Sequence, residues 1–157
     1  MAVQTSYKPQ FYVDAVTPAQ ADDAYPLIRA IAPEVTVEGW RDYVQRRYRM
    51  GGLLGLHSET DGIVGLLSYR LGERMRHGLV LALDDFVTFE LSQAAPGRKA
   101  LLAAAERLAL DLGCTGLELR LSARGFAETD GARAQGWTSL GLSLDSVIFV
   151  KALTSTG

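Results

Sequence analysis

Gly97, Arg98 and Lys99 are the residues best placed by type and spacing to do chemistry, because they stand where a strand turns into a helix. The surrounding segment, FVTFELSQAAPGRKALL from residue 86 to 102, reads as a strand, a Gly/Pro turn and an Ala/Leu helix. The first turn of a helix presents backbone N–H groups and a partial positive charge. Arg98 and Lys99 add their own charges there. The junction is therefore predicted to bind the anionic tail of a cofactor.

This segment resembles the acyl-CoA-binding core of the GNAT superfamily of N-acetyltransferases, in which a strand, a Q/R-x-x-G-x-G/A loop and a helix follow one another. The loop here reads QAAPGR from residue 93 to 98. Gln93 fits the signature, whereas Pro96 and Arg98 take the places of its two small residues. Gly97 lies between them and can supply the close approach of backbone to ligand one position away.

The resemblance covers about the second half of the chain. After the helix it continues through Gly113-Cys114-Thr115-Gly116 and the strand LELRL to a short helical stretch ending in Gly136-Trp137, similar to the family's Gly-Phe. The closing SVIFVKAL is similar to the family's last strand. The resemblance implies an α/β (α+β) fold with a mixed, mostly antiparallel sheet of about seven strands and flanking helices. The strands near 79–91 and 117–121 are expected to be parallel and splayed.

The resemblance also implies acetyl-CoA as the acyl donor, with no metal. A splay leaves one strand edge unpaired, and its N–H and C=O groups can pair with the amide-bearing pantetheine arm as a missing strand would. The same N–H groups can polarise the thioester carbonyl during attack. The expected cofactor contacts are Val87, Thr88 and Phe89 on the strand, and Gln93, Ala94, Ala95, Pro96, Gly97, Arg98 and Lys99 in the loop and first helical turn.

Proton transfer needs residues of its own, because an attacking amine must be neutral and a lysine-like amine has a pKa of about 10.4. Asp85 lies about where the family often has a strand acid and is the candidate catalytic base; a solvent-facing or hydrogen-bonded acid is the alternative interpretation. Strand alternation points the adjacent Asp84 to the opposite face and does not decide between the two. The family's general-acid tyrosine position holds Ala132. That acid is missing unless Tyr69 or an earlier tyrosine reaches in from the third strand or second helix.

The first half of the chain is predicted to supply a strand at 11–16, a helix from Thr17-Pro18 to about residue 31, and a second helix from Thr36 to Gly51. On the second helix, Arg41, Arg46 and Arg49 form either a solvated face or a rim that steers an acidic substrate or the cofactor phosphates.

Hairpins connect the strands that follow. Asp61-Gly62 is a strong turn signal, and a second turn is expected within 72–78, so the strands between residues 53 and 91 should form an antiparallel meander. Apolar residues at helical spacing then predict a helix that packs on the sheet: Leu101, Leu102, Ala105, Leu108, Ala109 and Leu112. The whole chain, 1–157 with a core of about 10–153, is interpreted as a single domain.

Composition agrees with a small enzyme of this kind. The chain has 157 residues, 48% of them hydrophobic and 22% charged, and a formal net charge of -2. These values give no electrostatic footprint for nucleic acid, and no apolar run approaches the length of a membrane span. The N-terminus lacks the apolar stretch of a signal peptide. One cysteine and two histidines make neither an internal disulfide nor a metal cluster. We expect a cytoplasmic protein that binds neither nucleic acid nor membrane; a homodimer stays open.

The function predicted from these residues and the resemblance is acyl-CoA-dependent N-acetyl transfer to a primary amine of a small molecule or peptide. Transfer is expected to be direct, with Cys114 as a small buried residue and not a nucleophile. The alternative is a GNAT-like domain that binds acyl-CoA or a partner without turnover, which Pro96, Arg98 and Ala132 together favour. An unrelated α/β binding domain would make the order of the elements a coincidence.

Overall fold

The computed structural model describes residues 11–89, 95–121 and 132–153, and the chain divides into two compact units, 1–121 and 122–157. The first unit is built on a five-stranded sheet whose spatial order follows the chain. Its strands are β1 (Phe11–Ala15), β2 (Gly51–Ser58), β3 (Gly62–Arg74), β4 (Gly78–Thr88) and β5 (Gly116–Leu119).

Strand pairing in this sheet is antiparallel from β1 to β4 and parallel between β4 and β5. The predicted meander and the parallel pair are thus confirmed. Both hairpin turns contain a glycine with positive φ, Gly62 at 72° and Gly78 at 71°, a conformation that costs glycine little because it has no Cβ.

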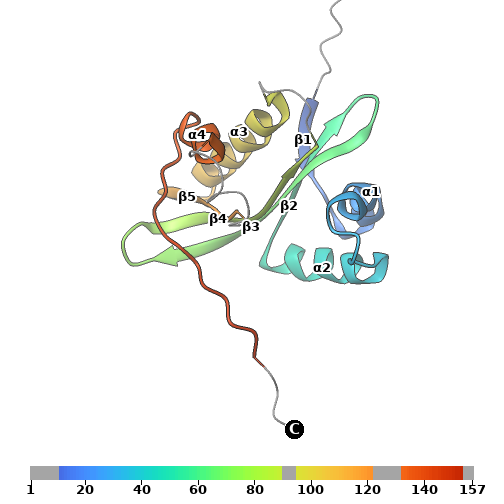
Figure 1. Ribbon diagram of the computed structural model, residues 1–157, viewed down its shortest axis with the longest axis horizontal. Helices are drawn as coiled ribbons and strands as arrows, with labels where there is room; N and C mark the ends of the chain where they lie inside the picture. The colour runs from blue at the N-terminus through green and yellow to red at the C-terminus, as the bar shows by residue number, and fades with distance from the viewer. Residues whose placement is uncertain (1–10, 90–94, 122–131, 154–157) are drawn as a thin grey trace, which may run out of the picture. The chain divides into compact units, whose positions relative to one another are not determined.

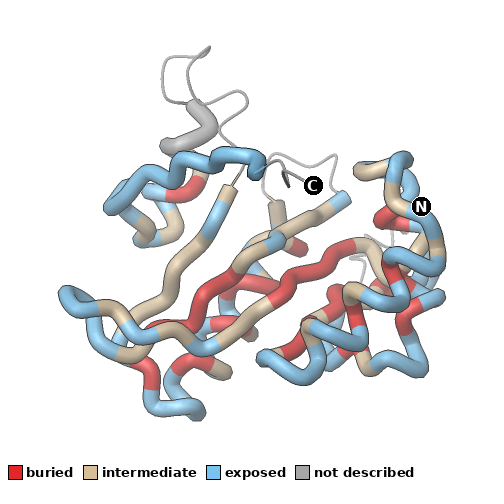
Figure 2. Tube along the Cα trace, turned by 90° about the horizontal axis from the view of Figure 1, so that it is seen from below, coloured by how far each residue is buried: buried red, intermediate tan, exposed pale blue. Residues whose placement is uncertain are grey.

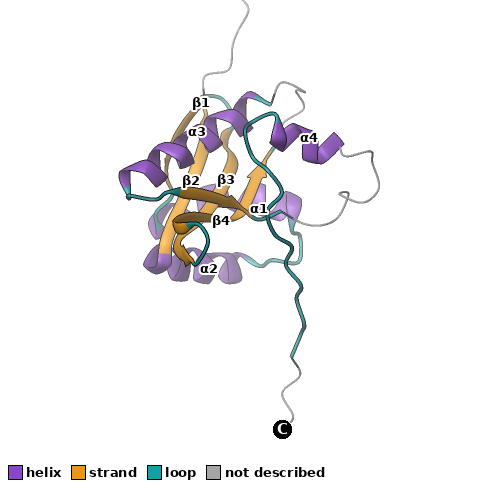
Figure 3. Cartoon of the chain, turned by 90° about the vertical axis from the view of Figure 1, so that its left-hand side faces the viewer, coloured by secondary structure: helices purple, strands orange, loops and turns teal. Residues whose placement is uncertain are grey.

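Three helices flank the sheet of the first unit: α1 (Ala21–Ile31), preceded by a short 3-10 turn at Pro18–Gln20, α2 (Val37–Met50) and α3 (Pro96–Asp111). Figure 1 shows α1 and α2 on one side of the sheet and α3 on the other; Figure 3 shows the same strands from the side, between these helices. The Thr36 side chain accepts a hydrogen bond of 3.1 Å from Gly39 N and so caps α2 where the sequence predicts its start.

Each side of the sheet buries its own apolar cluster. Under α1 and α2 the buried residues are Val16, Ala21, Ala24, Leu27, Ile28, Trp40, Val44, Leu53 and Leu66. Under α3 they are Leu56, Leu67, Leu81, Leu83, Leu101, Ala105, Ala109 and Cys114. Figure 2 shows the buried positions concentrated along the strands and the inner sides of the helices. We refer to the two sides as the α2 face and the α3 face.

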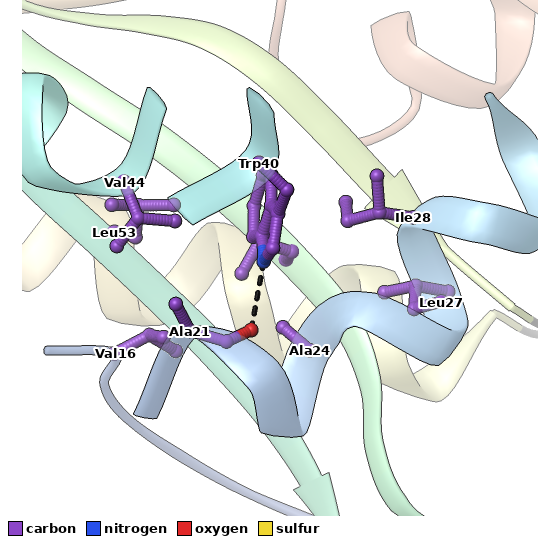
Figure 4. Packing of buried hydrophobic residues seen from close by; sticks show 9 residues of the cluster. Val16, Ala21, Ala24, Leu27, Ile28, Trp40, Val44 and Leu53 are labelled. Carbon is purple, nitrogen blue, oxygen red and sulfur yellow. Dashed lines mark hydrogen bonds between the residues drawn. The ribbon is translucent and has the colours of Figure 1, made fainter. Parts of the chain in front are cut away.

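Trp40 fixes α2 against α1. Its side chain is 4% exposed, and its indole Nε1 donates a hydrogen bond of 2.7 Å to the carbonyl oxygen of Ala21. Figure 4 shows the indole among Val44, Leu53 and the apolar residues of α1. Because a buried Trp with a satisfied N–H has one preferred position, it also holds the neighbouring turns of α2 in place.

The second unit contains α4 (Ala132–Thr138), and residues 142–153 form no strand in the structure. The sheet therefore has five strands within the described part of the chain, and the expected closing pair, which would make about seven, is wrong for those residues. Val147 and Phe149 are 72% and 94% exposed. The strand-like sequence SVIFVKAL has no partner strand there, and a strand without a partner leaves its backbone groups to water. Whether both units make up one domain stays a prediction.

No helix in the residues that the structure describes is long and apolar enough to span a bilayer.

Candidate active site

A β-bulge in β4 sets the geometry of the candidate site. Ser68 and Tyr69 are neighbours on β3, yet they pair with Asp85 and Leu83 on β4, which leaves Asp84 as an extra residue. An extra residue in one strand shifts the alternation of its side chains by one position.

The bulge brings both acids of β4 to the α2 face. Arg47 of α2 donates to Asp84 Oδ2 over 2.7 Å, and the Tyr43 hydroxyl, one helical turn earlier, donates to Asp85 Oδ2. The expectation that the two carboxylates point to opposite faces is therefore wrong. It assumed a regular strand, and the bulge removes that regularity.

Asp85 is exposed, but one of its carboxylate oxygens accepts a hydrogen bond from a buried side chain of β3. Ser68 Oγ, fully buried, donates to Asp85 Oδ2 over 2.6 Å and accepts from Asp85 N over 3.1 Å. Tyr43 adds its hydroxyl to the same oxygen. Burial, and then the hydrogen bond to the Asp85 carboxylate, raise the pKa of Tyr43 above its ordinary value of 10.0. Tyr43 thus stays protonated at neutral pH and acts as a donor.

The second oxygen of Asp85 has a different surrounding. Among the described residues, no donor is hydrogen-bonded to Asp85 Oδ1. A carboxylate with one oxygen fixed by two hydroxyls and the other able to accept a proton has the arrangement of a positioned base.

Asp84 is surrounded by three arginines. Arg47 Nη1 and Arg70 Nε donate to its Oδ2 at 2.7 and 2.8 Å, and Arg120 Nη1 lies 3.8 Å from Oδ1. The Asp84 side chain is only 9% exposed. Burial acts to raise the pKa of Asp84, but the hydrogen bonds from Arg70 and Arg47 outweigh it and lower that pKa below 3.8. Asp84 is thus charged at neutral pH and anchors the guanidinium groups.

This site lies where β4 and β5 stop pairing. Their ladder covers Val80 to Leu83, and one further hydrogen bond of 3.0 Å joins Arg120 N to Leu83 O. Within the described residues, strand β4 continues to Thr88 beside β3 alone. The expected splay of β4 and β5 stays a prediction, because residues 122–131 lie outside the described part of the chain.

The predicted edge residues differ in which way their backbone points. Phe89 N donates to Val64 O of β3 over 2.8 Å. Because hydrogen-bonding directions alternate along a strand, the backbone groups of Val87 also face β3, whereas those of Thr88 face away from it. Of the three residues expected to offer backbone groups to a ligand, Thr88 is the one whose groups point outward.

The start of α3 has an unusual turn before it. Ala95 adopts φ 44° and ψ 56°, a left-handed conformation that is unfavourable for a residue with a Cβ. Pro96 opens the helix without an N–H, so its first N–H groups belong to Gly97, which is buried, and Arg98, which is half-buried. Lys99 is exposed, and its N–H donates a hydrogen bond of 3.2 Å to Ala95 O.

The remaining predicted positions fall into three groups. Gln93 and Ala94 fall in 90–94, which the structure does not describe. Ala132 begins α4 in the second unit. Tyr69 is on the α3 face, where it lines a shallow groove of about 350 Å³ with residues of β1, β2 and α3.

The site residues that sequence analysis missed are Tyr43, Ser68, Arg47, Arg70 and Arg120. Tyr43 and Arg47 stand four residues apart, with the Arg47 guanidinium carbon 5.4 Å from the centre of the Tyr43 ring. That spacing is visible in the sequence, and the second helix was among the places from which a tyrosine could reach the site, but no tyrosine of that helix was singled out. Nothing local in the sequence connects Ser68 or Arg70 with Asp84 and Asp85, since that contact depends on the register of β3 against β4.

Within residues 11–89, 95–121 and 132–153, no group of three or more His, Cys, Asp or Glu could hold a metal ion.

No protein-family model matches the sequence, and no curated protein matches it. Solved structures do match the fold. The aminoglycoside N-acetyltransferase AAC(6')-Iy in complex with CoA has a TM-score of 0.73 and 12% identity, over 93% of this chain and 97% of that one. Ribosomal-protein-alanine N-acetyltransferase from Brucella melitensis biovar Abortus 2308 has a TM-score of 0.72 and 14% identity, over 92% and 100%.

A third similar structure is glucosamine-6-phosphate N-acetyltransferase from Arabidopsis thaliana, with a TM-score of 0.65 and 14% identity over 92% of this chain and 99% of that one. The fold of the chain is that of the GNAT N-acetyltransferases, which confirms the resemblance seen in the sequence.

Proposed function

We propose that this chain, which has the GNAT fold, is an acyl-CoA-dependent N-acetyltransferase that moves an acetyl group directly to a primary amine of a small molecule or peptide. The observation that carries the proposal is Asp85, whose carboxylate is fixed by Tyr43 and Ser68 beside the end of the β4–β5 ladder. A buried serine and a half-buried tyrosine both donate hydrogen bonds to this one exposed carboxylate, which favours a function for it.

Acetyl-CoA would be held by residues of β4 and of the α3 start. The outward backbone groups of Thr88 suit the amides of a pantetheine arm, as an added strand would pair with a sheet edge. The left-handed turn at Ala95 and the buried Gly97 bring backbone N–H groups to the first turn of α3, where Arg98 and Lys99 add positive charge for the pyrophosphate. Val87, Phe89, Gln93, Ala94 and Pro96 complete the proposed binding segment.

Acetyl transfer forms an N–C bond and breaks the C–S bond of the thioester. Asp85 would take a proton from the amine, directly or through one water, so that the nitrogen lone pair can attack. Backbone N–H groups at the β4 edge would stabilise the charge on the carbonyl oxygen. CoA leaves as a thiolate, and because a thiol has a pKa of about 8.5, it can leave without an acid at the position of Ala132.

Direct transfer is supported by the place of the only cysteine. Cys114 is 8% exposed and belongs to the apolar cluster on the α3 face, whereas Asp85 lies on the α2 face. A buried thiol in apolar surroundings is a poor nucleophile. Incubation with acetyl-CoA alone should leave the intact mass unchanged; a stoichiometric acetyl adduct on Cys114 would overturn direct transfer.

The proposal extends to the setting of the protein. Both units would belong to a single domain with a core of about 10–153, and the one cysteine suits the reducing cytoplasm. The similar structures act, by name, on an aminoglycoside, a ribosomal-protein alanine and glucosamine 6-phosphate. These acceptors differ in size and charge, so the fold does not choose the acceptor.

The test measures release of free CoA from acetyl-CoA with a broad panel of primary amines, most clearly at alkaline pH, where the acceptors are neutral. Asp85→Asn should lower the rate by about 10²–10⁴-fold while the affinity for acetyl-CoA is kept. Asp23→Asn, on the exposed surface of α1, is the matched control and should retain full rate.

The alternative, a domain that binds acyl-CoA without turnover, makes the opposite prediction. Calorimetry would then show acetyl-CoA binding, while no amine in the panel releases CoA. An Asp85→Asn variant with the full rate of the wild type would also remove Asp85 from the chemistry.

A further inference from the structure

We propose that Arg120 and Arg70, arranged around Asp84, bind an anionic group of the acceptor. The acceptor would then be a small primary amine that carries a carboxylate or a phosphate a few bonds from its nitrogen. This inference rests on the function proposed above and names the substrate class of the same site.

The cluster holds more positive charge than its own carboxylate can balance. Three guanidinium groups converge on Asp84, those of Arg47, Arg70 and Arg120. Even when the charge of Asp85 is added, three cations face two carboxylates among the residues that the structure describes. A bound anion would complete the balance.

The three arginines are not equivalent. Arg47 is 13% exposed and Arg70 is 26% exposed, and both make short hydrogen bonds to Asp84, of 2.7 and 2.8 Å. Arg120 is 50% exposed and stands 3.8 Å from Asp84. That distance exceeds a hydrogen bond, so among the described residues no side chain accepts from the Arg120 guanidinium, and its N–H groups can donate to a ligand.

The other acid near Arg120 is already paired. Glu118 lies two residues earlier on β5, hence on the same face, and it accepts hydrogen bonds of 3.0 and 2.8 Å from Arg74. Apart from Asp84, no described side chain is within ion-pair distance of Arg120. Pairing with the described residues therefore does not explain the position of Arg120.

The cluster lies next to the candidate base. Asp84 and Asp85 are consecutive, both side chains reach the α2 face, and Arg120 Nη1 lies 3.8 Å from Asp84 Oδ1. Because the acid that Arg120 approaches is the neighbour of Asp85, we expect an acceptor that meets both Asp85 and Arg120 to be a small molecule. Amino acids and amino-sugar phosphates share this chemistry.

The cluster is also separate from the proposed site for the cofactor phosphates. Those phosphates would bind at the start of α3, which covers the opposite face of the sheet (Figure 1). Two anion-binding regions on two faces fit a reaction in which donor and acceptor enter from different sides.

The experiment compares matched pairs of amines in the CoA-release assay. One arm pairs amino acids with their amides, and the other pairs amino-sugar phosphates with the free amino sugars. We expect kcat/KM to be at least about tenfold higher for the anionic member in one arm, which identifies carboxylate or phosphate as the group bound. Equal kcat/KM within every pair would overturn the inference.

Arg120→Gln then tests the residue. It should reduce the ratio of anionic to neutral kcat/KM about tenfold, and added salt should reduce the ratio in the wild type as well. Arg76→Gln, an exposed arginine in the β3–β4 turn, is the matched control and should leave the ratio unchanged. A ratio that Arg120→Gln does not alter would overturn the assignment.

A binding measurement separates this inference from the proposed function. Titration with inorganic phosphate and with acetate, followed by backbone amide NMR, should shift the signals of Leu119 and Arg120 in the wild type and not in Arg120→Gln. If no amine is turned over but these shifts occur, the enzyme proposal fails and the anion site stands. If turnover occurs without shifts or anionic preference, the anion site fails and the enzyme proposal stands.

Discussion

The two faces of the sheet are built in different ways. On the α3 face the buried cluster is apolar throughout, from Leu56 on β2 to Leu101 on α3. On the α2 face the apolar cluster includes Trp40 and Val44, and Tyr43 and Arg47 of the same helix make hydrogen bonds with the two acids of β4.

This difference separates stability from chemistry. Burying apolar area stabilises a fold without any need for exact partners. A carboxylate with several guanidinium groups must offset a large desolvation cost, and such groups are often no more stabilising than apolar residues of the same size. The α3 face therefore explains why the sheet holds together, and the polar end of the α2 face calls for a functional explanation.

The largest effect on stability is expected from the α3 face. Leu101 is fully buried at the centre of that cluster, so Leu101→Ala should lower the free energy of unfolding by about 4 kcal/mol. Urea denaturation measures this loss in the free energy of unfolding. The ratio of anionic to neutral kcat/KM of the remaining folded protein should not change; a changed ratio would mean that the faces are not independent.

Asp84→Asn is the counterpart on the α2 face. Removing the charge leaves three arginines without their shared carboxylate, and we expect a loss of about 3 kcal/mol in the free energy of unfolding, at the low end for a buried ion pair because two of the arginines are partly exposed. Unlike Leu101→Ala, this variant should also change acceptor preference.

The pH dependence of that loss follows from the pKa of Asp84. Folding lowers this pKa below its ordinary 3.8, so the carboxylate contributes its full stabilisation above pH 3.8 and loses it as the pH falls through the lower, folded-state pKa. Wild type and Asp84→Asn should therefore differ most near neutral pH and converge in strong acid. A difference that stays constant down to pH 2 would contradict the charge-based explanation.

A smaller effect is expected at the proposed cofactor site. Replacing Arg98 and Lys99 together by alanine should weaken the binding of acetyl-CoA about tenfold, through the loss of charge-assisted contacts to phosphate that water partly screens. Calorimetry measures the affinity. Arg29→Ala with Arg76→Ala, exposed on α1 and in the β3–β4 turn, is the matched control, and equal weakening in both double variants would point to net charge instead of a site.

Tyr43→Phe is expected to have the smallest effect on stability, about 1 kcal/mol, since it removes one hydroxyl from a half-buried ring. Tyr43→Phe should lower the rate of CoA release and leave the affinity for acetyl-CoA unchanged, because Tyr43 positions Asp85 and touches no part of the proposed donor site. If Tyr43→Phe kept the full rate of CoA release, Tyr43 would be only a structural neighbour of Asp85.

Local sequence determined most of the elements. The cap at Thr36 and Gly51 after the helix predicted α2, and the turn at Asp61-Gly62 predicted the β2–β3 hairpin, because caps and turns depend on residues a few positions apart. The apolar spacing of Leu101, Leu102 and Ala105 predicted which side of α3 is buried. Local sequence also predicted a strand at SVIFVKAL, but in the described residues this strand-like sequence has no partner and forms no strand.

Asp85 could be singled out from the sequence, but its surroundings could not. One extra residue, Asp84, in the pairing of β4 with β3 turned both acids to the same face, and the packing of Trp40 under α1 placed Tyr43 and Arg47 above them. Register and helix docking are set by contacts between residues far apart in the chain, whose energies no local pattern contains. The sequence alone determined that these residues exist at helical and strand spacing; only the tertiary structure decided that they form one site.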